Sequence, residues 1–123
     1  MAYLNDRVFD NGLTVLDTEA DAVYVTSAEA TTYAEATSTY ALGSSSSLSI
    51  GAPEDRTGGG RKVAVDAISD GAITGTGTVT HYALVDTANS RLLATAALTA
   101  TQSVTNGNTF TLATFDIGIP DPV

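Results

Sequence analysis

The chain lacks cysteine and tryptophan and holds few basic residues. Its 123 residues include one His, five Lys and Arg, and 14 Asp and Glu, for a formal net charge of −9. Without cysteine the chain has no disulfide framework and no thiolate metal site. The scarcity of Lys and Arg argues against nucleic acid or an anionic membrane as a partner, because phosphate is neutralised by clustered basic residues.

Long apolar runs are also missing. No segment approaches the roughly 18 apolar residues of a membrane span, and the stretch Met1 to Gly12 lacks the basic and apolar regions of a signal peptide. We therefore expect a protein made in the cytoplasm. Ala, Thr, Ser and Gly dominate the composition, and aromatic residues make up 7%. Side chains this small form a thin core, so oligomerisation would be a natural supplement.

Residues 1–20 form an N-terminal arm or hairpin in this interpretation. Asn11-Gly12 is a turn signal, which predicts either a hairpin that continues into Leu13-Thr-Val-Leu or an extended arm over residues 1–12. The apolar side chains of this segment are too few to form a core alone, so we expect them to dock elsewhere, for example on a neighbouring subunit. They are Tyr3, Leu4, Val8 and Phe9.

Residues 21–123 read as a single β domain. Ala22 to Thr26 is a predicted strand, with Val23 and Val25 on one face. Residues 27–43 mix helix-favouring Ala and Glu with Thr and Tyr, and we expect extended or irregular structure there. A strand is predicted from Lys62 to Ile68, followed by a turn at Ser69-Asp-Gly.

Ala72 to Asp86 is predicted as one long strand, or as two strands bent at Gly75 and Gly77. Turns follow at Thr87-Ala-Asn-Ser and at Asn106-Gly107.

Between those turns, Arg91 to Ala100 places Leu92, Ala94, Ala96, Leu98 and Ala100 on one face at period two, which favours a strand over the competing helix. In Thr109 to Ile119, Phe110 and Leu112 fall on even positions, whereas the later apolar residues fall on odd positions. If both sets face the core, a bulge must lie near Ala113 and Thr114. The predicted fold class is all-β, an antiparallel β-sandwich or small β-barrel with an extended N-terminal arm.

No residue pattern points to catalysis. His81 is the only histidine, so we interpret it as a sheet residue, because no second His or Cys completes a metal site. Asp17, Glu19 and Asp21 lack the pattern of an EF-hand loop and read as solvated acids on a strand edge. The glycine-rich stretches match no nucleotide fingerprint. We therefore expect no enzyme activity, no metal and no cofactor.

The basic residues are unevenly placed. Arg56, Arg61 and Lys62 are three of the five and gather on one glycine-rich loop, where they could meet an acidic partner surface; a solvated loop is the alternative. Together with the arm they make up the predicted partner-binding residues: Tyr3, Leu4, Arg7, Val8, Phe9, Arg56, Arg61 and Lys62.

Three phrases carry a resemblance. With Gly60-Arg-Lys-Val, the stretch from Thr76 to Leu93 and Asn106-Gly-Asn-Thr-Phe-Thr-Leu, the chain resembles small structural proteins of tailed bacteriophages, which are short, acidic, cysteine-free and rich in Ala, Thr and Gly. The resemblance covers residues 1–120. It implies a non-enzymatic head decoration protein in the virion that binds the major capsid protein or another virion protein, often as a trimer, and it carries over no active-site residue.

Two other classes stay open at this point. A tail, collar or fibre component would share the composition, and a β-sandwich carbohydrate-binding module would share the fold. The absence of Trp and the low aromatic content count against stacking on sugar rings.

Overall fold

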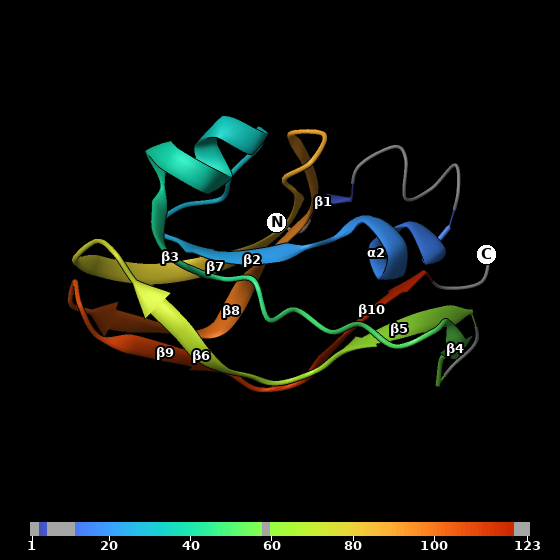
Figure 1. Cartoon of the computed structure of the whole chain (residues 1–123). Helices are drawn as coiled ribbons and strands as arrows, with labels where there is room; N and C mark the ends of the chain where they lie inside the picture. The colour runs from blue at the N-terminus through green and yellow to red at the C-terminus, as the bar shows by residue number, and fades with distance from the viewer. Residues whose placement is uncertain (1–2, 5–11, 58–59, 120–123) are drawn as a thin grey trace.

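The computed structural model describes residues 3–4, 12–57 and 60–119 and shows an all-β protein, as the sequence predicts (Figure 1). A seven-stranded antiparallel sheet has the order β1-β8-β7-β2-β3-β6-β9, and a smaller sheet has the order β10-β5-β4. The larger sheet curls into an incompletely closed barrel, and the smaller sheet lies at one end of it (Figure 1).

The elements have the following bounds. The strands are β1 Tyr3–Leu4, β2 Ala22–Thr26, β3 Ala41–Ser45, β4 Glu54–Asp55, β5 Arg61–Val65, β6 Ile68–Ile73, β7 Gly77–Asp86, β8 Arg91–Val104, β9 Thr109–Leu112 and β10 Phe115–Ile119. The helices are α2 Thr14–Glu19 and the π-helix η1 Glu35–Thr39.

Apolar side chains pack on both faces of the central strands. In β2, Val23 and Val25 face the main core inside the curled sheet, as predicted from their alternation. Tyr24 and Ala22 face outward, where they pack with a second group of small side chains beneath η1. Ala30 and Ala36 in that group are fully buried, because side chains this small let the helical segment lie directly against the sheet.

Helix α2 corrects the hairpin interpretation of the N-terminus. Leu13-Thr-Val-Leu, a strand in that alternative, begins a helix whose Val15 and Leu16 are buried in the main core. Gly12 precedes it with a φ of +73°, a conformation that glycine adopts without strain. The other half of the expected hairpin lies outside the described residues.

A second helical segment replaces the extended structure expected within residues 27–43. Its start is capped: the Glu35 amide donates to Thr32 Oγ1 (3.1 Å), and Glu35 Oε1 accepts from the amide and hydroxyl of Thr31 (2.9 and 2.8 Å). These bonds lower the pKa of Glu35. The arrangement resembles a capping box, which satisfies amides that a helix leaves unpaired at its N-terminus.

The predicted turn at Ser69-Asp70-Gly71 is wrong, because these residues lie within β6. The strand predicted from Lys62 to Ile68 is interrupted instead: β5 ends at Val65, and β6 begins at Ile68. Gly71 pairs with Phe110 of β9, and any Cβ at Gly71 would overlap the Phe110 ring. Gly71 therefore provides room for an aromatic cross-strand neighbour and not for a turn.

The next stretch is two strands and not one. β6 ends at Ile73 and β7 begins at Gly77, on either side of the predicted bend. The turns at Thr87–Ser90 and Asn106-Gly107 are confirmed, and Gly107 has a φ of +96°.

Strand β8 confirms the choice of strand over helix for Arg91 to Ala100. Its alternation is interrupted, however, because Leu92 pairs with Val85 while Ala94 pairs with Leu84. One residue, Leu93, is thus extra in β8. As a result Leu92 packs with the second group of small side chains beneath η1, whereas Ala94 packs in the main core inside the curled sheet. The expectation that the two residues share a face is wrong.

The irregularity expected near Ala113 and Thr114 is present as a corner between two strands. β9 pairs with β6 in the larger sheet and β10 pairs with β5 in the smaller one, so the paired strands bend together from one sheet into the other. At the bend the Thr114 hydroxyl donates to the Val65 carbonyl oxygen at 2.7 Å.

Replacing Gly43 tests the close approach of β3 to β6. An added Cβ would lie 2.5 Å from the Ala72 carbonyl oxygen, a backbone atom that cannot swing away. Gly43→Ala should therefore lower the free energy of unfolding by about 1–3 kcal/mol in urea denaturation. Gly51→Ala is the matched control, since its Cβ would meet nothing closer than 3.9 Å. Equal stability of the two variants would contradict this strand pairing.

The ionisation of Asp70 should make the stability of the fold depend on pH. Hydrogen bonds from Ser47 (2.6 Å) and Ser45 (3.0 Å) hold the pKa of Asp70 below its ordinary value. A lowered folded-state pKa stabilises the fold above the unfolded-state pKa of about 3.9, and this contribution is lost as the pH falls through the folded value. We expect Asp70→Asn to be less stable than the parent at pH 7 and the gap to narrow as the pH falls below the ordinary aspartate pKa of about 3.9. A gap independent of pH would show that these bonds do not depend on the ionised carboxylate.

Candidate interaction surfaces

The predicted basic loop is placed at the smaller sheet, and its cations are paired there. Arg61 Nη1 lies 2.6 Å from Asp55 Oδ1, and Lys62 Nζ lies 3.0 Å from Asp116 Oδ2 and 3.7 Å from Glu54 Oε1. The hydrogen bond to Asp116, helped by the charges of Asp116 and Glu54, raises the pKa of Lys62. The loop is therefore a surface of alternating sign and not a basic patch.

The three cations lie on two faces of the smaller sheet. Arg56 and Lys62 line a hollow of about 400 Å³ with Asp116 and Gly118. Gly118 makes room there, because a Cβ at this position would lie 3.0 Å from Arg56 Cδ. Arg61 is next to Lys62 in β5 and so faces the opposite way. The structure thus brings Arg56 and Lys62 together and separates them from Arg61.

Arg61 lines a second, more apolar hollow, which we call the arm-end pocket. Its volume is about 360 Å³, and its lining residues are Gly12, Leu13, Thr14, Pro53, Gly60, Arg61 and Ile119. Gly12 is the last residue of the extended-arm alternative, residues 1–12, and Gly60 and Arg61 belong to the predicted loop. Of the predicted contact residues that the structure describes, Arg61 is the one that lines this pocket, next to Gly12 at the end of the extended-arm alternative.

Only part of the arm itself is described. Tyr3 and Leu4 form β1, which pairs antiparallel with β8 opposite Thr95 and Ala94. At these two residues the arm therefore lies on the sheet of its own chain. Arg7, Val8 and Phe9 lie outside the described residues, and docking on a neighbouring subunit stays a prediction.

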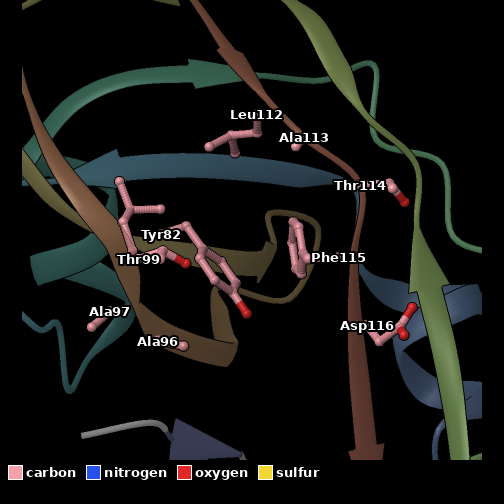
Figure 2. Close-up of a pocket in the computed structure, with 10 residues that line it drawn as sticks. Tyr82, Ala96, Ala97, Thr99, Leu112, Ala113, Thr114, Phe115 and Asp116 are labelled. Atoms are coloured by element: carbon pink, nitrogen blue, oxygen red, sulfur yellow. The ribbon is translucent and has the colours of Figure 1, made fainter.

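A third surface, which the sequence analysis missed, lies where the curled sheet stays open. This seam groove has a volume of about 320 Å³ and is lined by Tyr82, Ala96, Ala97, Leu98, Thr99, Leu112, Ala113, Thr114, Phe115 and Asp116. Figure 2 shows the rings of Tyr82 and Phe115 next to each other in the groove. The ring centroids are 4.5 Å apart, and the ring planes are tilted by 45°. Burial raises the pKa of the Tyr82 phenol.

The groove exists because β8 departs from the register of β7. Between the pairs His81↔Ala97 and Val79↔Gln102, β7 advances two residues and β8 advances five. The extra residues form a bulge, Leu98 to Thr101. Leu98 packs against the core, whereas every residue from Thr99 to Ser103 is exposed.

Among the described residues, no strand pairs with the edges beside the groove, and these edges carry no charge. In the described part of the chain, β7 alone pairs with β8 beyond Thr95, and β9 pairs only with β6. The sequence has no Asp, Glu, Lys, Arg or His from Leu92 to Phe115, although 14 acids and five bases are present elsewhere. This run of 24 residues is the signal in the sequence that could have revealed the surface.

The remaining candidates for chemistry in the sequence are His81 and the acidic residues. His81 lies in β7 with Nδ1 2.7 Å from Thr80 Oγ1. Within residues 3–4, 12–57 and 60–119, no three His, Cys, Asp or Glu side chains gather as metal ligands would. The same residues contain no helix long and apolar enough to cross a membrane.

No family model, curated protein or solved structure matches the chain. The grounds for a function are therefore its fold class and its surfaces.

Proposed function

We propose that the protein is a non-enzymatic structural component of a tailed-bacteriophage virion, a capsid decoration protein that binds the major capsid protein lattice and stabilises the head. The observation that supports the proposal is the arm-end pocket, where Gly12 at the end of the extended-arm alternative lies next to Gly60 and Arg61 of the predicted loop. The resemblance of the sequence to phage structural proteins supports the virion as the setting.

The residues around the arm-end pocket suit docking on a protein surface. Leu13, Pro53 and Ile119 supply an apolar floor, and Arg61 and Asp55 supply an exposed ion pair at its rim, with side chains 56% and 95% exposed. An exposed pair contributes little to folding but can exchange partners across an interface, where it sets orientation and association rate.

Repetition would supply the affinity. A short arm loses much of its burial energy to ordering, since fixing each residue costs about 1–2 kcal/mol. A single arm therefore binds weakly. Many copies on a symmetric lattice, each held at the arm and at the loop, gain from effective concentration without further contacts.

Co-sedimentation with purified phage heads tests the proposal. Deletion of residues 2–9 should abolish binding while circular dichroism shows an intact β fold. Arg61→Glu should weaken binding about tenfold or more, because it reverses the charge at the pocket rim. Arg61→Lys is the matched control, since it keeps the charge and should keep most of the binding.

Other outcomes point elsewhere. Binding of the intact protein to tails but not to heads would replace decoration by the tail, collar or fibre role. Unchanged head binding by both variants would remove the arm-end pocket from the contact, and binding to neither particle would overturn the virion proposal.

A further inference from the structure

We draw no further inference here: the strongest candidate, the polar hollow of about 390 Å³ beside β2, β3 and β6, carries nothing, because hydroxyls of the same chain already bond its two carboxylates, Asp21 and Asp70, and no second observation among the described residues points to a ligand.

Discussion

The two sheets depend on one hydrogen-bonded corner. At this corner β5 continues into β6 and β9 continues into β10, and the Thr114 hydroxyl donates to the Val65 carbonyl oxygen. A bend in a strand leaves backbone groups without their ladder partners, and an unpaired buried carbonyl is costly. The Thr114 side chain supplies a donor to the Val65 carbonyl oxygen at this bend. Because the corner lies beside Phe115, it also fixes one wall of the seam groove.

The sequence allowed the strands to be predicted where local pattern and burial agree. β2 alternates cleanly because Val23 and Val25 meet the inner core, and the turn at Asn106-Gly107 follows from glycine at a positive φ. The helices were missed for different reasons. α2 has only six residues, so its stability comes from the packing of Val15 and Leu16 in the core. Helix propensities, which describe the local sequence, do not include this packing. The pattern Thr32-x-x-Glu35 was a readable capping signal.

The candidate sites were less accessible to sequence reasoning. The gathering of Arg56, Arg61 and Lys62 was visible, but the acid that neutralises Lys62 is Asp116, 54 positions away. Likewise Phe110 covers Gly71 from another strand, so the glycine looked like a turn. The seam groove is lined by residues of β7, β8 and the corner between β9 and β10. The extra residues of β8 beside it are recognisable only from the pairing of β8 with β7. Contacts between distant segments decide all three features.

The wide bulge in β8 also separates the two ladders on either side of it. In a regular strand, one inserted or deleted residue moves every later side chain to the opposite face. Here Ala97 and Gln102 are both anchored to β7, and the residues between them are outside that register. A change of length within Leu98–Thr101 can thus be absorbed locally, with the pairs on both sides kept. The bulge Leu98–Thr101 is therefore the part of β8 whose length can vary most freely between related chains.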